Sequence, residues 1–173
     1  KVGVTHDDGA RNTKIRIAEN CFLGPNRLGD VPSDSRQQLY DILNGVCDDL
    51  QTLHPLKPEV SELLYVYYPT GGFYRRHKDA VSTTSSIMRT YSLLLYLNDK
   101  NWDSKIDGGS LRIFFRDDDD DDRYMDVNPA GGTLVIFASD VYHEVLDTSR
   151  QRMAVVGWFQ RPPRVGDVVG LVQ

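Results

Sequence analysis

The hydrophobic pattern before residue 60 is typical of one amphipathic helix. Its apolar side chains recur at three- and four-residue spacing, at Leu39, Ile42, Leu43, Val46 and Leu50. Ser33 or Asp34 can cap the start of this helix by accepting a hydrogen bond from a free backbone N–H. We expect the helix to run to about Leu53, because two prolines follow closely and proline cannot continue a helix.

After residue 60 the pattern changes to short runs rich in β-branched and aromatic residues, separated by glycine, proline, asparagine and aspartate. These runs predict strands at Glu62–Tyr68, Phe73–His77, Tyr91–Asn98, Ser110–Phe115, Tyr124–Val127, Thr133–Ala138 and Arg152–Gln160. Alternation at Thr13–Ile17 predicts an edge strand as well. A helix followed by many short strands indicates a mainly β (α+β) fold, an antiparallel barrel or a two-sheet jelly roll with N-terminal helical support.

The composition is that of an ordinary globular protein of 173 residues, for which we expect a single domain over residues 1–173 with its core at about 60–160. The net charge of −5 comes from the unbroken acidic run Asp117–Asp122, and no basic stretch indicates a nucleic-acid partner. No apolar run approaches the roughly 18 residues of a membrane span. Two cysteines, Cys21 and Cys47, are too few for a disulfide scaffold, which favours a reducing, cytoplasmic location, or the nucleus in a eukaryote.

The candidate chemistry begins with His77-Lys78-Asp79, at the end of a predicted strand. Residues i and i+2 of a strand face the same way, so His77 and Asp79 can point at one metal ion. His143 lies past a later apolar strand and can supply a third ligand. Two histidines and a carboxylate that leave other positions open are the facial triad of non-haem Fe(II) oxygenases. His6-Asp7-Asp8 also matches the spacing, but a chain start without a preceding strand holds ligands poorly.

Arg152 opens the last apolar strand, where alternation puts it on one face with Ala154, Val156 and Trp158. A charge on an inward face is costly unless it is paired, and a bound carboxylate would satisfy it in bidentate fashion. The alternative is an arginine at the mouth of the strand that reaches solvent. Arg150 is the rival candidate, although its loop position favours solvent exposure.

Three stretches carry a family resemblance: Tyr68-Pro69 through Asp79, Tyr96-Leu97-Asn98 through Gly108-Gly109-Ser110 to Phe114, and Gly131-Gly132 through His143-Glu144-Val145 to Trp158-Phe159. Together they resemble the prolyl 4-hydroxylase branch of the 2-oxoglutarate- and Fe(II)-dependent dioxygenases. Within that branch they are most similar to the intracellular hypoxia-inducible-factor (EGL-nine-type) prolyl hydroxylases and their microbial relatives.

The resemblance implies a double-stranded β-helix, or jelly roll, and a reaction in which O2 and 2-oxoglutarate give a hydroxylated product, succinate and CO2. It implies that His77, Asp79 and His143 bind Fe(II), with ascorbate as a candidate reductant. It also implies that a retained Asp79 favours hydroxylation over halogenation. The implied substrate is a proline-containing protein or peptide, and we expect a monomer without nucleic-acid or membrane partners.

The same resemblance implies that Arg152 pairs with the distal carboxylate of 2-oxoglutarate and that the Tyr96 hydroxyl supports that carboxylate. Tyr68 would lie near the metal and cosubstrate, and Trp158 would line the pocket on the substrate side. Val156 stands where some relatives have a polar residue near the cosubstrate. For both tyrosines, core packing with the hydroxyl at the rim is the alternative.

Other readings stay open from the sequence. One is a 2-oxoglutarate oxygenase that acts on a free amino acid or small metabolite; others are a catalytically silent jelly-roll binding module and a cupin-like metal enzyme. The acidic run is expected to be a solvated hairpin loop, with a docking surface for a basic segment or a weak cation site as alternatives. Further substrate-facing candidates are the Ala80–Thr90 loop, the Arg161–Gln173 tail and a basic patch of Arg75, Arg76 and Lys78.

Overall fold

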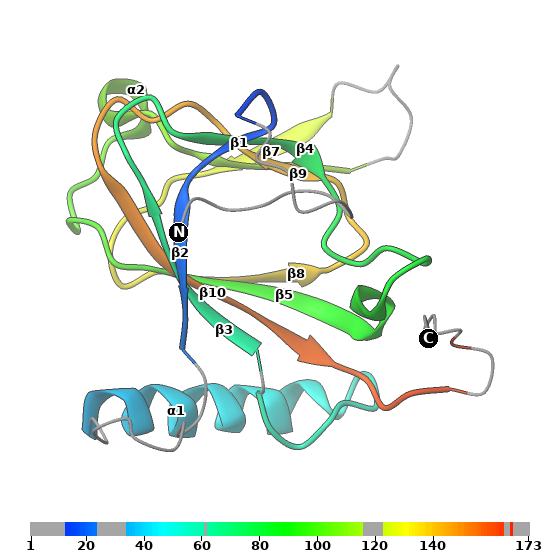
Figure 1. The fold of residues 1–173 in the computed structure, drawn as a ribbon. Helices are drawn as coiled ribbons and strands as arrows, with labels where there is room; N and C mark the ends of the chain where they lie inside the picture. The colour runs from blue at the N-terminus through cyan, green and yellow to red at the C-terminus, as the bar shows by residue number, and fades with distance from the viewer. Residues whose placement is uncertain (1–12, 24–33, 61, 116–122, 165–166, 168–173) are drawn as a thin grey trace.

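The computed structural model describes residues 13–23, 34–60, 62–115, 123–164 and 167. Its strands form two five-stranded sheets in which all paired neighbours are antiparallel. In the upper sheet of Figure 1 the order is β1 (Arg16–Ile17), β4 (Phe73–His77), β9 (His143–Val145), β6 (Leu111–Phe114) and β7 (Tyr124–Val127). In the lower sheet it is β2 (Glu19–Phe22), β3 (Glu62–Tyr68), β10 (Arg152–Gln160), β5 (Arg89–Tyr96) and β8 (Leu134–Ala138).

Helix α1 (Asp34–Leu50) lies beneath the lower sheet (Figure 1), and short helical turns occur at η1 (Ser85–Met88) and α2 (Ser104–Asp107). The predicted mainly β fold with a supporting N-terminal helix is therefore confirmed. None of the helices in the described part of the chain combines the length and apolar character needed to span a bilayer.

Period-two alternation along β10 divides the core into two parts. Ala154 faces the other sheet and packs in a cluster with Val66, Tyr96, Leu111 and Val145. The intervening side chains face α1, as the second cluster shows: it contains Leu63, Leu93, Val155 and Phe159 from the sheet and Tyr40, Leu43 and Cys47 from the helix. The inward face of β10 is thus the face that begins with Arg152 and ends with Trp158.

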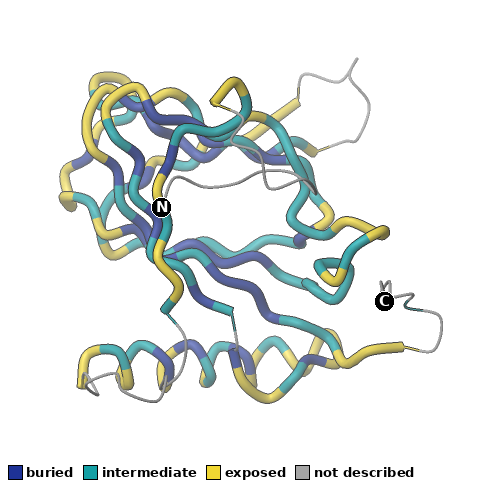
Figure 2. The backbone as a smooth tube through the Cα atoms, in the orientation of Figure 1, coloured by how far each residue is buried: buried dark blue, intermediate teal, exposed yellow. Residues whose placement is uncertain are grey.

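The helix differs from its prediction in two respects. It ends at Leu50 rather than at Leu53, and its buried stripe is Tyr40, Leu43 and Cys47, whereas Ile42 is 64% exposed. Figure 2 shows buried and exposed segments alternating along this helix. A stripe through positions 40, 43 and 47 leaves Ile42 turned away from the sheet, because each residue rotates the helix by about 100°. Cys47 is buried, and neither Cys47 nor Cys21 forms a disulfide.

The strand predictions are confirmed to within one residue for β3, β4, β6, β7, β8 and β10, and β5 begins and ends two residues before its predicted bounds. The predicted edge strand at Thr13–Ile17 is present as the shorter β1 at the edge of its sheet, and β2 and β9 were not predicted. The acidic run Asp117–Asp122 lies outside the described residues, but the strands on either side, β6 and β7, pair antiparallel. His6-Asp7-Asp8 and the possible cap Ser33 also lie outside the described residues.

Candidate metal and cosubstrate site

Three side chains from two distant parts of the chain meet between the sheets. His77 ends β4, Asp79 follows it, and His143 opens β9 directly opposite His77 in the strand register. Asp79 Oδ1 lies 3.6 Å from His77 Nε2, and Asp79 Oδ2 lies 3.5 Å from His143 Nε2. One ligand atom from each of the three residues lies within 4.8 Å of the others, so they could hold one metal ion.

Both imidazole rings are held with Nε2 toward the carboxylate. His77 Nδ1 lies 2.8 Å from the Arg75 carbonyl oxygen, and His143 Nδ1 lies 3.0 Å from the Val141 carbonyl oxygen. A carbonyl oxygen only accepts hydrogen bonds, so each Nδ1 carries a proton, and in a neutral ring Nε2 then keeps the lone pair that a metal needs. Histidine ligands of metals are oriented in this way.

The Asp79 carboxylate is anchored by a buried hydroxyl pair. Ser92 Oγ donates to Asp79 Oδ2 at 2.7 Å and lies 3.0 Å from Ser139 Oγ. The Ser139 carbonyl accepts the backbone N–H of Asp79 at 3.0 Å, which fixes the chain as well as the side chain. Neither serine was singled out from the sequence. Strand alternation from Tyr96 back to Ser92 could have suggested an inward hydroxyl, but not its partner.

The charges of the triad favour metal binding. Burial opposes ionisation of Asp79, but the nearby imidazoles and the Ser92 hydroxyl outweigh burial and hold the pKa of this carboxyl well below its usual range. Burial lowers the pKa of His143 to about 4, although the Asp79 carboxylate opposes that shift. At neutral pH the site therefore presents a carboxylate and a neutral imidazole, which are the forms that bind a cation.

Arg152 carries a fully buried positive charge. Its Nε donates to the Gly109 carbonyl at 2.9 Å, but Nη1 and Nη2 are buried without hydrogen-bond partners among the described residues. The Tyr96 hydroxyl is also buried, with no hydrogen-bond partner among the described residues, and the guanidinium carbon lies 5.0 Å from the Tyr68 ring centroid and 5.1 Å from that of Tyr96. A buried cation beside a buried hydroxyl donor makes a site for a carboxylate.

Close packing also fixes the position of Arg152. Gly109 has φ +71°, and a Cβ at this position would come within 3.0 Å of Arg152 Cδ. The glycine therefore allows both the turn and the approach of the arginine.

A cavity of about 260 Å³ opens between the sheets beside the triad. We call it the inter-sheet cavity. Its walls include the triad itself, Tyr68 and Tyr74, the β10 side chains Val156 and Trp158, the pair Glu62 and Arg89, and Arg16 and Asn20 from the first strands. Sequence reasoning had assigned Tyr68 and Trp158 to this region, but it had not found Tyr74, Glu62, Arg89, Arg16 or Asn20.

Glu62 and Arg89 form a hydrogen-bonded ion pair on one wall of the inter-sheet cavity. Arg89 Nε donates to Glu62 Oε2 at 3.2 Å, and Arg89 Nη1 donates to the Asp79 carbonyl at 3.2 Å. The guanidinium also lies over the Trp158 ring, 3.6 Å from its centroid. This contact fixes the indole on the cavity wall and links it to the backbone of the triad.

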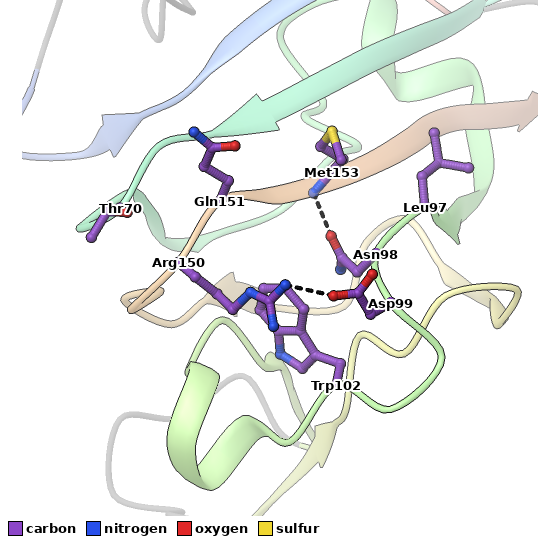
Figure 3. A pocket seen from close by; sticks show the side chains of 8 residues that line it. All are labelled: Thr70, Leu97, Asn98, Asp99, Trp102, Arg150, Gln151 and Met153. Carbon is purple, nitrogen blue, oxygen red and sulfur yellow. Dashed lines mark hydrogen bonds and ion pairs between the residues drawn. The ribbon is translucent and has the colours of Figure 1, made fainter.

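Arg150, the rival to Arg152, faces a different pocket. Arg150 lines a surface pocket of about 310 Å³, where it pairs with Asp99 and lies against Trp102 (Figure 3). The Arg150 side chain is 48% exposed, as its loop position predicted. Only Arg152 of the two arginines is buried without an acidic partner among the residues that the structure describes.

The basic residues next to His77 are engaged elsewhere. Arg75 forms an ion pair with Asp147 at 2.8 Å. The Arg76 guanidinium and the Lys78 ammonium both lie against the Tyr142 ring, at 4.7 Å and 4.4 Å from its centroid. None of the three lines the inter-sheet cavity.

Comparison with known proteins agrees with this geometry. The family model described as the 2OG-Fe(II) oxygenase superfamily matches residues 63–160. The chain is 29% identical over 153 residues to prolyl hydroxylase EGLN3 of Mus musculus, which covers 87% of this chain and 61% of that protein. It is 35% identical over 151 residues to Egl nine homolog 1 of Homo sapiens, which covers 86% of this chain and 33% of that protein. The chain thus spans under two thirds of the length of these relatives.

Solved structures give the same picture. A Pseudomonas putida prolyl-4-hydroxylase superimposes with a TM-score of 0.72 at 31% identity, over 87% of this chain and 75% of that one. A Trichoplax adhaerens prolyl hydroxylase, solved with a peptide fragment of the hypoxia-inducible-factor oxygen degradation domain, superimposes with a TM-score of 0.68 at 20% identity, over 92% of this chain and 70% of that one. At that lower identity the likeness shows the fold alone.

Proposed function

Because the chain belongs to the 2OG-Fe(II) oxygenase superfamily, we propose that it is a dioxygenase that hydroxylates the 4-position of a prolyl residue in a protein substrate. The cofactor and cosubstrates of this family are Fe(II), 2-oxoglutarate and O2. In the overall reaction, one oxygen atom of O2 enters the substrate C–H bond and the other enters succinate, while 2-oxoglutarate loses CO2. The catalytic domain is proposed to extend over residues 1–173, with its core at about 60–160.

The observation that carries the proposal is the combination of an open metal triad with a buried Arg152 whose terminal nitrogens have no partner among the described residues. In this proposal His77, Asp79 and His143 bind Fe(II) through one side of its coordination shell. When bound, the iron supplies the oxygen chemistry that an unactivated C–H bond requires. The protein contributes two oriented imidazoles, an ionised carboxylate and a cavity between the sheets.

The proposed role of Arg152 is to bind the distal carboxylate of 2-oxoglutarate through Nη1 and Nη2, while the Tyr96 hydroxyl donates a further hydrogen bond. Both donors are buried without a hydrogen-bond partner among the described residues, and a carboxylate bound there would satisfy them. A 2-oxo acid with one carboxylate would leave the guanidinium unpaired, which typically costs about 3–5 kcal/mol. This difference supports a dicarboxylate as the cosubstrate.

Tyr68 and Trp158 are proposed to contact the cosubstrate and the substrate, respectively. Tyr68 lines the inter-sheet cavity and also lies beside Arg152. Trp158 lines the cavity from the far end of β10, next to the Arg89 contact with the Asp79 carbonyl. A prolyl substrate is supported by the names of the similar proteins, three of which are called prolyl hydroxylases.

The test is a succinate-release assay with Fe(II), 2-oxoglutarate, O2 and proline-containing peptides, followed by mass spectrometry of the peptides. We expect the amount of succinate released to match the amount of peptide whose proline gains one oxygen atom. The variants His77→Ala, Asp79→Ala and His143→Ala should lose both iron and turnover, whereas His54→Ala, on an exposed histidine, should keep both. Turnover with free proline alone would favour the amino-acid oxygenase, and retention of iron by all three triad variants would contradict the metal assignment.

A further inference from the structure

The wall of the inter-sheet cavity that comes from the first strands carries an arginine. Residues 16–22 cross from one sheet to the other, with β1 in the upper sheet and β2 in the lower (Figure 1). Ala18, between the two strands, packs in the inter-sheet core. Arg16 and Asn20, two residues to either side, line the cavity. This short segment therefore presents a guanidinium and an amide to any molecule that enters.

The Arg16 guanidinium has no acidic partner within the described residues. Its Nε is buried without a hydrogen-bond partner among those residues, and the guanidinium lies over the face of the Tyr74 ring, 4.7 Å from the centroid. An aromatic face attracts a cation but does not accept the directed N–H bonds that a guanidinium can donate. The side chain thus keeps free donor capacity at the cavity.

The carboxylates that line the same cavity are already engaged. Glu62 forms hydrogen-bonded ion pairs with Arg89 and accepts a further bond from Gln160 at 3.2 Å. Asp79 is held by Ser92 and belongs to the metal triad. Neither compensates Arg16, so this arginine adds a positive field to the part of the cavity it faces.

Arg16 also lies close to the proposed reaction centre and is separate from the proposed cosubstrate site. The Tyr74 ring, which contacts Arg16 on β1, stacks on His77 with 3.5 Å between ring centroids. Arg152 instead pairs in register with Tyr68 at the start of β10. A group bound to Arg16 would therefore lie beside the His77 side of the triad, where a substrate is oxidised.

From these contacts we propose that Arg16 binds a carboxylate of the substrate and so selects substrates with an acidic group next to the oxidised residue. The inference rests on the proposed function and extends it to the substrate's charge. Two sources share this chemistry: an acidic side chain that flanks the target residue in a peptide, and the α-carboxylate of a free amino acid. Asn20, on the same wall, can donate a neighbouring hydrogen bond.

Pairs of candidate substrates that differ only in a carboxylate or an amide separate the effect of the substrate's charge from that of its shape. Blocked peptides with Asp immediately before or after proline are compared with the same peptides carrying Asn, and L-proline is compared with L-prolinamide. Each probe is measured for turnover and, by titration calorimetry, for binding to the protein loaded with Mn(II) and 2-oxoglutarate. We expect at least one carboxylate probe to be preferred over its amide by about tenfold, the size of one charge-assisted hydrogen bond.

The variants locate the origin of that preference. Arg16→Gln should abolish it, Arg16→Lys should keep part of it, and Lys105→Gln, which removes an exposed positive charge on α2, should leave it unchanged. The Michaelis constant for 2-oxoglutarate should not change in Arg16→Gln, which would separate this subsite from Arg152. If Arg16→Gln does not fold, Asn20→Asp tests the same wall, because a carboxylate there should repel the preferred probe.

The possible outcomes differ for the two proposals. Preferential binding of a carboxylate probe without hydroxylation of proline would refute prolyl hydroxylation and leave the Arg16 subsite standing. Equal binding of carboxylate and amide, binding of no probe, or a preference that survives in Arg16→Gln would overturn the subsite. A preference confined to Asp peptides assigns it to a flanking acidic residue, and one confined to L-proline assigns it to a free amino acid.

Discussion

Ser92 Oγ donates a 2.7 Å hydrogen bond to Asp79 Oδ2, and both groups lie in the interior between the sheets. The Ser92 side chain is fully buried and lies 3.0 Å from Ser139 Oγ, so the two hydroxyls form a short chain that ends on the carboxylate. The bond restricts rotation of the carboxylate between the two imidazoles. It thereby fixes one ligand of the proposed iron site before the metal binds.

Ser92→Ala should therefore weaken Fe(II) binding by about 10- to 100-fold, the range typical of residues that orient metal ligands. The metal-free protein is titrated with Fe(II) under anaerobic conditions in the presence of 2-oxoglutarate. The readout is the visible charge-transfer band that appears when Fe(II) and 2-oxoglutarate are both bound. Turnover at saturating iron should fall much less than the affinity. Ser82→Ala, at an exposed serine in the loop after Asp79, is the control, and equal iron affinities in the two variants would contradict a positioning role.

Arg152 and Arg150 form a natural pair for testing the cosubstrate site. Arg152→Ala should raise the Michaelis constant for 2-oxoglutarate by at least about 100-fold, because a buried ion pair that loses one partner typically costs about 3–5 kcal/mol. Arg150→Ala removes an exposed ion pair with Asp99 and should change that constant less than about twofold. Steady-state succinate release measures both variants. A similar loss in both would show that the burial of Arg152 is not what matters.

Much of this site could be predicted from the sequence because its main residues lie on regular strands or directly next to them. The inward alternation that begins at Arg152 follows from the geometry of a strand. Asp79 was expected to continue the strand of His77, but β4 ends at His77 and Asp79 lies two residues beyond that end. His143 was predicted only as a residue beyond a strand. It in fact opens β9, a three-residue strand in the middle of its sheet, and so short a strand has no period to detect.

The remaining contacts depend on tertiary pairing. Ser92 reaches Asp79 only because β5 lies in the opposite sheet from β4, and Arg16 reaches Tyr74 only through the pairing of β1 with β4. Such neighbours are distant in the sequence and share no local pattern. The same limit applies to α1, where the apolar spacing predicted the helix but did not distinguish Ile42 from the residues that the sheet covers.

The stability of the metal-free protein should fall as the pH drops through the titration range of the triad. Burial lowers the pKa of His143 to about 4, whereas an unfolded histidine titrates near 6.5. The unfolded chain therefore binds the proton more readily, and the free energy of unfolding should decrease by up to about 1.4 kcal/mol per pH unit as the pH falls from about 6.5 to about 4. The lowered pKa of Asp79 acts in the same direction at lower pH, since its contribution is present above about pH 4 and is lost as the carboxylate is protonated.

Urea unfolding at a series of pH values, with a chelator present, measures this dependence. His143→Gln cannot take up the proton and should show a flatter profile between pH 4 and 6.5. If the free energy of unfolding depended on pH equally steeply in the unchanged protein and in His143→Gln, burial would not be what holds His143 in its neutral form.

The packing of α1 against the lower sheet should govern the stability of the fold without taking part in the chemistry. Leu43 is 1% exposed and packs in the cluster between the helix and the sheet, so Leu43→Ala should lower the free energy of unfolding by about 2–5 kcal/mol. Ile42, the adjacent residue, is 64% exposed, and Ile42→Ala should change it by less than about 0.5 kcal/mol. Chemical denaturation of both variants gives the comparison. Equal destabilisation by the two substitutions would show that the helix presents a different face to the sheet. The expected difference in stability, with the iron affinity of both variants unchanged, would show that α1 stabilises the fold without affecting the metal site.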